Sequence, residues 1–212
     1  NKLKPQSIAE TTRSPIHPSQ FFQIIKETLP EDAVIFSDIG NTMAWAIHDL
    51  TILEKQSFFL ALGLGSMGSG IGGAIGAKTI HKDKTVICFV GDATMQMHGS
   101  EVLTAIENNL AVVFVVLNDK GHGMVDHGCK ILDLNAGEVR FKNGINFMQW
   151  SSAYQLCAYR AETIKDYLNL PLSQIFSSKA PQLIEVMIDE KVVPPVLSRT
   201  RVLGQSEQLR EE

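Results

Sequence analysis

Three segments of the sequence place an aspartate beside glycine and short polar side chains directly after an expected strand, namely residues 37–41, 91–94 and 118–121. In an open parallel sheet, ligands bind outside the carboxyl ends of the strands, so we expect the three turns to border one crevice. Glycine lets a backbone approach an oxyanion closely, and free N–H groups at the start of a helix attract negative charge. The spacing therefore favours an anionic ligand.

Asp92 and Asp119 would repel such an anion unless a cation lay between them. Mg²⁺ prefers hard oxygen ligands, typically one or two carboxylates together with phosphate oxygens and water, and it neutralises both partners. We therefore interpret the two aspartates as ligands of a metal that bridges to a phosphate group. The alternative is a turn residue and a helix cap, which would be ordinary for either aspartate alone.

A glycine-rich segment, Gly63–Gly76, holds seven of the sixteen glycines in the chain. Inside a helix each glycine costs about 0.5 to 1 kcal/mol relative to alanine, so some other interaction must offset the loss. Glycines four residues apart share one helix face and permit close packing, whereas Gly63 and Gly65 lie in the preceding loop, where a ligand can approach. Tight packing alone would explain the helix but not the loop.

The same segment also satisfies the pattern G-x-G-x-x-G over residues 63–68, which is typical of dinucleotide-binding enzymes. In that alternative, an NAD-dependent oxidoreductase, Asp92 would contact a ribose. The alternative leaves Asn118 and Asp119 without a role.

The elements that must position these turns follow an alternating pattern from Pro18 onward. The continuous apolar runs at 86–90 and 112–117 are typical of strands covered on both faces. The sequence thus predicts an α/β fold with three layers, a doubly wound and mainly parallel sheet flanked by helices. Expected strands lie at 33–37, 58–61, 85–90, 111–117 and 182–188, and expected helices at 19–28, 42–49, 68–79, 95–108, 146–154 and 161–168.

Composition limits the possible ligands. Nineteen basic and 23 acidic residues give a net charge of −4, so neither nucleic acid nor an anionic membrane surface is an expected partner. No apolar run reaches the length of a membrane span of about 20 residues, and the three cysteines lack metal-ligand spacing, which indicates reduced thiols and a cytoplasmic location. We expect a linker or the end of a preceding segment at 1–18, a binding domain at 19–200, and a polar tail at 201–212.

At these turns and at Gly65-Ser66-Met67-Gly68 the sequence resembles the diphosphate-binding domain of thiamine-diphosphate enzymes, in particular the acetohydroxyacid synthase and 2-oxoacid decarboxylase superfamily. The signature of that family is Gly-Asp-Gly followed further along the chain by Asn-Asn, and here Gly91-Asp92-Ala93 is followed by Asn118-Asp119. The resemblance runs from about residue 16 to 195. It implies the thiamine-diphosphate-binding fold, with thiamine diphosphate and Mg²⁺ as cofactors.

The resemblance also implies a role for individual residues. Asp92 and Asp119 would bind the metal through their side chains and Gly121 through its carbonyl oxygen. Met67 would lie under the bent cofactor, although filling the core is the commoner role of methionine. The cofactor-binding residues implied by the family are Gly40, Asn41, Thr42, Gly65, Ser66, Met67, Asp92, Ala93, Thr94, Asp119, Gly121, His122, Gly123 and Met124.

Two departures from the family pattern stand out. Asp119 replaces the second asparagine, which keeps an oxygen ligand and adds negative charge. The tryptophan that usually follows Gly-Met-Val in the synthases is absent, so branched-chain specificity does not follow. His122, Asp126 and His127 could be acid–base groups or solvated loop residues, and Glu101 is expected to form structural hydrogen bonds.

The resemblance implies a domain of a 2-oxoacid decarboxylase or carboligase, similar to acetolactate synthase and acting on a small 2-oxoacid. No catalytic residue is expected in this chain, because in such enzymes the activating glutamate belongs to a pyrimidine-binding domain or subunit. The isolated chain is therefore expected to be inactive and to work in a homo-oligomer. A regulatory module that binds thiamine diphosphate without turnover is the non-enzymatic alternative.

Overall fold

A computed structural model describes residues 11–195 of the chain. The predicted polar tail at 201–212 and the first ten residues of the predicted linker lie outside this range. Ile16, near the end of that linker, is fully buried and forms a parallel bridge with Ile188. Contacts of the domain therefore extend at least to Ile16, which precedes α2 (Pro18–Ile25).

The described residues form one six-stranded sheet in the order β2-β1-β3-β4-β6-β5, and every pair of neighbouring strands is parallel. The predicted doubly wound α/β fold is confirmed. The strands β3 and β4 are buried at nearly every position, which agrees with their continuous apolar sequences. The strands are β1 (Val34–Ser37), β2 (Ser57–Leu60), β3 (Val86–Gly91), β4 (Val112–Asn118), β5 (Cys157–Ala161) and β6 (Gln182–Met187).

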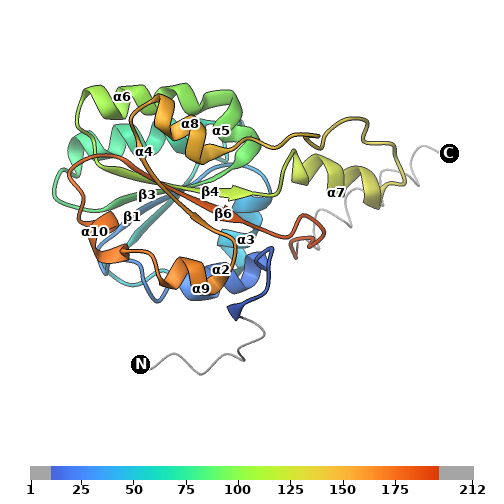
Figure 1. The fold of residues 1–212 in the computed structure, drawn as a ribbon, viewed down its shortest axis with the longest axis horizontal. Coiled ribbons are helices and arrows are strands. Elements are labelled where there is room, and N and C mark those ends of the chain that lie inside the picture. The colour runs from blue at the N-terminus through green and yellow to red at the C-terminus, as the bar shows by residue number, and fades with distance from the viewer. Residues whose placement is uncertain (1–10, 196–212) are drawn as a thin grey trace.

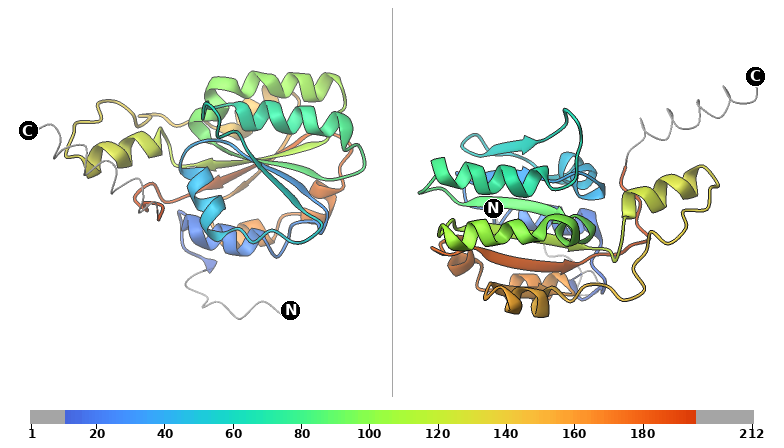
Figure 2. Two further views of the ribbon diagram at one scale, coloured as in Figure 1. Left: turned by 180° about the vertical axis from the view of Figure 1, so that it is seen from behind. Right: turned by 90° about the horizontal axis from the view of Figure 1, so that it is seen from above.

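Helices cover both faces of the sheet and complete the three layers (Figure 1). One face carries α4 (Ser69–Ile80), α5 (Asp92–His98), η1 (Gly99–Glu101), α6 (Val102–Glu107) and α8 (Phe147–Ala153). The other face carries α2 (Pro18–Ile25), α3 (Asn41–Asp49), α9 (Ile164–Leu168) and α10 (Leu172–Phe176). Helix α7 (Gly123–Ile131) projects beyond the carboxyl ends of the strands, as two further views show (Figure 2).

A separate apolar core lies on each face of the sheet. On the α2 side, Phe21 and Phe22 pack edge to face with Tyr167 and Phe89, respectively. On the α4 side, buried aliphatic residues of α4 and α6 pack against β3 and β4. These two cores hold β1, β3 and β4 rigidly side by side, so the turns at their carboxyl ends share one edge.

The helices described within residues 11–195 include none with the length and apolar character of a membrane span.

The structure adds three elements that the sequence patterns did not predict. Strand β5 is an edge strand of mixed polarity, half-exposed along most of its length, so it lacks the apolar run of a buried strand. Helix α7 contains two glycines, which weaken the helical signal, and α10 has only five residues. The predicted helix at 95–108 is instead interrupted by η1 at residues 99–101 and begins earlier, at Asp92.

Candidate functional site

The carboxyl ends of β1, β3 and β4 border a cavity of about 280 Å³. Its lining contains every predicted cofactor-binding residue except Ser66, which is exposed in the loop before α4. The lining residues come from the three strand ends and the segments that follow them, from the loop before α4, and from the end of β6: Ile39, Gly40, Asn41, Thr42, Gly65, Met67, Gly91, Asp92, Ala93, Thr94, Leu117, Asp119, Gly121, His122, Gly123, Met124, Val125 and Ile188.

Asp92 is the first residue of α5, and its side chain is buried. Its Oδ2 accepts a hydrogen bond of 3.0 Å from the N–H of Gly121, whereas its buried Oδ1 has no hydrogen-bond partner among the described residues. Burial, together with the nearby carboxylate of Asp119, raises the pKa of Asp92 to about 8. A buried carboxylate oxygen without a partner, facing a second carboxylate, is the environment that a divalent cation would satisfy.

Asp119 follows the last residue of β4 and is also buried. Burial raises the pKa of its carboxyl group, although the neighbouring Arg140 acts in the opposite direction. A Cβ atom at Gly123 would collide with the Asp119 carboxylate and lie 2.8 Å from Nδ2 of Asn41, so only glycine fits between them. The close approach keeps this carboxylate beside the starts of α3 and α7.

The donor set fits magnesium better than a soft metal. Within residues 11–195 there is no group of three or more histidine, cysteine, aspartate or glutamate side chains placed to hold a metal ion. Two carboxylates would leave coordination positions for a backbone oxygen, an anionic ligand and water, which is the usual arrangement for Mg²⁺ with a phosphate. Asp92, Asp119 and Gly121 all line the cavity, as the predicted metal site requires.

A buried hydrogen-bond chain shapes the turn that carries Asp119. The Nδ2 of Asn118 donates to Oε1 of Glu185 over 2.7 Å, and Oδ1 of Asn118 accepts from the N–H of Lys120 over 3.1 Å. Lys120 adopts a positive φ of 59°, which the second bond stabilises. Asn118 thus serves the site as a support for the turn, and it does not line the cavity.

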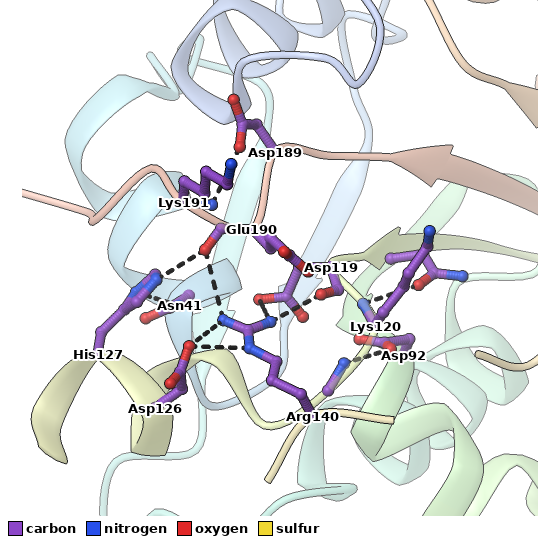
Figure 3. A network of polar contacts seen from close by, with 12 residues as sticks. Asn41, Asp92, Asp119, Lys120, Asp126, His127, Arg140, Asp189, Glu190 and Lys191 are labelled. Carbon is purple, nitrogen blue, oxygen red and sulfur yellow. Dashed lines mark hydrogen bonds and ion pairs between the residues drawn. The ribbon is translucent and has the colours of Figure 1, made fainter. Parts of the chain in front are cut away.

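Arg140 holds the same turn from the side of α7 (Figure 3). Its Nη1 donates to the carbonyl oxygen of Asp119 over 2.7 Å and lies 3.3 Å from the carboxylate Oδ2 of that residue. Its Nε and Nη2 donate to Oδ2 of Asp126 over 2.8 and 2.7 Å. A short antiparallel bridge between Gly121 and Arg140 pins the two backbones together. Arg140 thereby fixes the Asp119 turn and balances part of its charge.

The helix starts at the cavity are arranged for an anion. Gly40, which caps α3, has a φ of 116° that favours glycine, and Gly91 caps α5. Neither residue has a side chain to bond the first N–H groups of its helix, so oxygen atoms of a ligand could approach those groups. Gly65 and Met67 line the cavity from the loop before α4, where an apolar part of a ligand would lie.

The acid–base candidates differ in whether they line the cavity. His122 lines the cavity and packs edge to face with Phe141. Asp126 and His127 are buried but do not line it, since Asp126 pairs with Lys130 and Arg140, and His127 contacts Asn41 and the carbonyl oxygen of Glu190. Glu101 is exposed in η1 and does not line the cavity either. Of these candidates, only His122 can face a ligand there.

Three supporting residues were not predicted: Asp38 as an acceptor for the loop before α4, Arg140 and Glu185. Glu185 could have been predicted from the sequence, because it is a carboxylate within the otherwise apolar residues 183–187 and a buried carboxylate needs a partner. The role of Arg140 could not have been predicted, since this residue lies in a segment without a periodic pattern of apolar residues. Asp38 was visible in its turn, but its partners are 30 and 32 residues away.

Both the sequence and the fold of this chain are similar to those of known proteins. A family model described as "Thiamine pyrophosphate enzyme, C-terminal TPP binding domain" matches residues 38–186, which include both aspartates and the loop before α4. Among curated proteins, the chain is similar to acetolactate synthase isozyme 1 large subunit of Escherichia coli K12, at 32% identity over 82% of the chain and 32% of that protein. It is also similar to the acetolactate synthase large subunit of Cyanidium caldarium, at 27% identity over 99% of the chain and 36% of that protein.

Among solved structures, the fold is similar to the thiamine diphosphate-dependent 4-hydroxybenzoylformate decarboxylase of Rhodococcus jostii RHA1. The TM-score is 0.76 at 22% identity, over 88% of this chain and 35% of that one. The chain thus spans about a third of the length of the proteins named here. The family match leaves the predicted dinucleotide alternative without support, because the glycine-rich loop falls inside the matched domain.

Proposed function

The chain belongs to the family of C-terminal TPP-binding domains of thiamine pyrophosphate enzymes, and on that premise we propose that it binds the diphosphate of thiamine diphosphate through Mg²⁺. The observation that carries the proposal is a buried oxygen of Asp92 that has no hydrogen-bond partner within residues 11–195, in a carboxyl group that lies close to the Asp119 carboxylate and lines the same cavity. The side chains of Asp92 and Asp119 and the carbonyl oxygen of Gly121 would hold the metal.

The remaining lining residues divide the ligand between them. The turn Gly40–Thr42 and residues Ala93 and Thr94 would receive the diphosphate oxygens at two helix starts. Gly65 and Met67, together with the segment His122–Met124, would contact the ring portion. Ser66 is exposed outside the cavity, so its predicted contact would have to come from its backbone.

Thiamine diphosphate, when bound, supplies a nucleophilic carbon and an electron sink for cleaving the bond next to the carbonyl group of a 2-oxoacid. The chain's own residues would neutralise and orient the diphosphate, and Met67 would contact the ring portion. His122 would place a titratable group at the wall of the cavity. We propose that the substrate is a small 2-oxoacid and that the reaction is a decarboxylation or a carboligation.

We further propose that this chain requires a pyrimidine-binding domain or subunit, and that the active protein is a homo-oligomer. The chain matches only about a third of each of the two synthases named above, both of which are described as large subunits. Within residues 11–195, His122 is the only one of the acid–base candidates considered above that lines the cavity. Steady release of CO₂ from 2-oxoacids by the purified 212-residue chain alone, with Mg²⁺ and thiamine diphosphate, would contradict this requirement.

Calorimetric titration with thiamine diphosphate tests the binding proposal directly. We expect saturable binding in the presence of Mg²⁺, no detectable binding in excess chelator, and no binding of NAD under either condition. Asp83→Asn, an exposed change at the opposite end of β3, is the control and should bind as the wild type does. Binding of NAD alone, or binding of thiamine diphosphate that is indifferent to the metal, would overturn the proposal.

A further inference from the structure

Asp38 is a completely buried carboxylate immediately after β1, and it does not line the cavity. Its Oδ1 accepts hydrogen bonds from the N–H groups of Gly68 and Gly70 over 3.0 and 2.9 Å. Its Oδ2 lies 3.2 Å from the same N–H of Gly68. Both donors belong to the junction between the loop that carries Met67 and α4, which we define as residues 68–70. Both oxygen atoms of the Asp38 carboxylate therefore contact this junction.

The junction needs this partner because of its own sequence. Gly68 is the N-cap residue of α4 and has no side chain to accept hydrogen bonds from the first turn. Asp38 supplies the missing acceptor from a different element, and hydrogen bonds to a carboxylate are stronger than those to a neutral oxygen. The first turn of α4 is therefore anchored to the end of β1.

Close packing on two sides fixes the position of the junction. Gly68 has a φ of 91°, and a Cβ atom there would lie 2.5 Å from Cγ of His98. A Cβ atom at Gly70 would lie 2.9 Å from the backbone N and Cα of Asp38. The His98 ring and the Asp38 backbone thus enclose the junction, which has no room to shift while Asp38 keeps its hydrogen bonds.

The junction stands between two parts of the cavity wall. Met67 and Gly65 precede it directly in the chain, and Gly40 follows Asp38 by two residues. The N–H of Asp38 also donates to the carbonyl oxygen of Phe89 in β3 over 2.8 Å, so the residue is fixed to the centre of the sheet. One carboxylate therefore sets the distance between the loop that carries Met67 and the turn at the start of α3.

We propose that Asp38 is a positioning residue that orients the Met67 loop toward the ring portion of the cofactor, without touching the cofactor itself. The proposal rests on the proposed function, since it assigns the ring portion to Met67 and the diphosphate to the helix starts. It follows that loss of the Asp38 carboxylate weakens recognition of the rings and leaves recognition of a bare diphosphate intact.

The test compares two probes on the full chain in the presence of Mg²⁺: thiamine diphosphate and inorganic pyrophosphate. Asp38→Asn keeps the size of the side chain but removes its charge and one acceptor oxygen. We expect it to bind thiamine diphosphate about tenfold more weakly, as for the loss of one charge-assisted hydrogen bond, and to bind pyrophosphate within about twofold of the wild type. Asp83→Asn is the matched control, with both affinities unchanged.

A second variant keeps the test decisive if Asp38→Asn does not fold, as judged by circular dichroism. His98→Ala removes the ring that packs on Gly68 and should produce the same selective loss, to a smaller extent. An equal loss for both probes, or no loss for either, in the folded variants would overturn the proposal. Failure of the wild type to bind either probe would instead refute the proposed function, and the assignment of Asp38 with it.

Discussion

Asp92→Asn should stabilise the metal-free protein and at the same time abolish its response to magnesium. The change removes one of the two carboxylates that face each other. In the wild type the N–H of Gly121 donates a hydrogen bond of 3.0 Å to Oδ2 of Asp92, and the amide oxygen of the variant can still accept this bond. The pKa of this carboxyl is about 8 in the folded protein and 3.8 as its ordinary value. At pH 7 the folded chain therefore retains a proton that the unfolded chain has released.

The linkage between pKa and stability gives the magnitude. Each pH unit above the ordinary pKa, up to the folded-state pKa, lowers the free energy of unfolding of the wild type by about 1.4 kcal/mol. At pH 7 the carboxyl group of Asp92 therefore destabilises the wild type by at most about 4 kcal/mol. Because the folded protein can relax around the pair, we expect Asp92→Asn to raise the free energy of unfolding by roughly 2 to 4 kcal/mol. For a domain of this size the increase corresponds to a rise in Tm of roughly 5 to 15 °C.

The dependence on pH has a defined sign. The folded-state pKa of Asp92 is raised, so the wild-type carboxyl is not destabilising below about pH 4, and its destabilising effect grows as the pH rises toward 8. The difference in stability between Asp92→Asn and the wild type should widen over the same interval. Asp83→Asn, exposed and distant from the site, should show no such trend.

Denaturant unfolding in chelator at several pH values measures the difference, and a second series with Mg²⁺ and thiamine diphosphate measures the ligand response. Ligands at a hundredfold excess over Kd should stabilise the wild type by about 2.7 kcal/mol and leave Asp92→Asn unchanged. The reasoning is refuted if Asp92→Asn is less stable than the wild type without metal. A ligand response equal to that of the wild type would refute it as well.

Three further predictions concern residues around the site. Asp119→Asn should keep metal-dependent binding of thiamine diphosphate within about tenfold, because its amide oxygen can still ligate Mg²⁺, whereas in Asp92→Asn the amide oxygen is held by the N–H of Gly121 and leaves an NH₂ group toward the metal. Asp119→Ala should abolish the binding in calorimetry. Arg140→Gln should lower the free energy of unfolding by about 1 to 3 kcal/mol, since it leaves the buried Asp126 with fewer charged donors. Although burial raises the pKa of Asp126, hydrogen bonds from its basic neighbours hold it below the usual range, so in acid denaturation curves this loss should persist down to about pH 4 and shrink only as the pH falls further, through the lowered pKa. Gly70→Ala should destabilise by about 1 to 3 kcal/mol through its clash with the end of β1, and Gly76→Ala, which faces open space on α4, should stabilise by about 0.5 to 1 kcal/mol in the same thermal melts.

The parts of this protein that the sequence predicted are those with local signals. The strands β3 and β4 are continuous apolar runs, and each is followed by an aspartate, so Asp92 and Asp119 could be placed at one edge of a parallel sheet. Gly65 was predicted from a glycine excess that helix packing did not explain, and Met67 from the resemblance of its loop to the family's cofactor loop. All four line the cavity.

The parts that the sequence did not predict depend on contacts between distant residues. Arg140 reaches the Asp119 turn from an irregular segment, and its hydrogen bonds depend on how that segment folds back. The residues of β5 alternate in polarity only weakly, because the strand has one neighbour and a solvated edge. Neither the reach of a side chain across such a segment nor the position of an edge strand is encoded in local periodicity.

The bond between Asn118 and Glu185 has a consequence for the order in which the protein matures. Glu185 belongs to β6, which is synthesised last of the six strands within residues 11–195 yet lies between β4 and β5. The N–H of Ile188 also donates to the carbonyl oxygen of Asn118 over 3.0 Å. A nascent chain whose β6 has not yet left the ribosome therefore already contains Asp92, the Met67 loop and Arg140, but it lacks the hydrogen bonds of Glu185 and Ile188 to Asn118. If Asp92 and Asp119 bind metal as proposed, a growing chain would gain this ability only once β6 has joined the sheet.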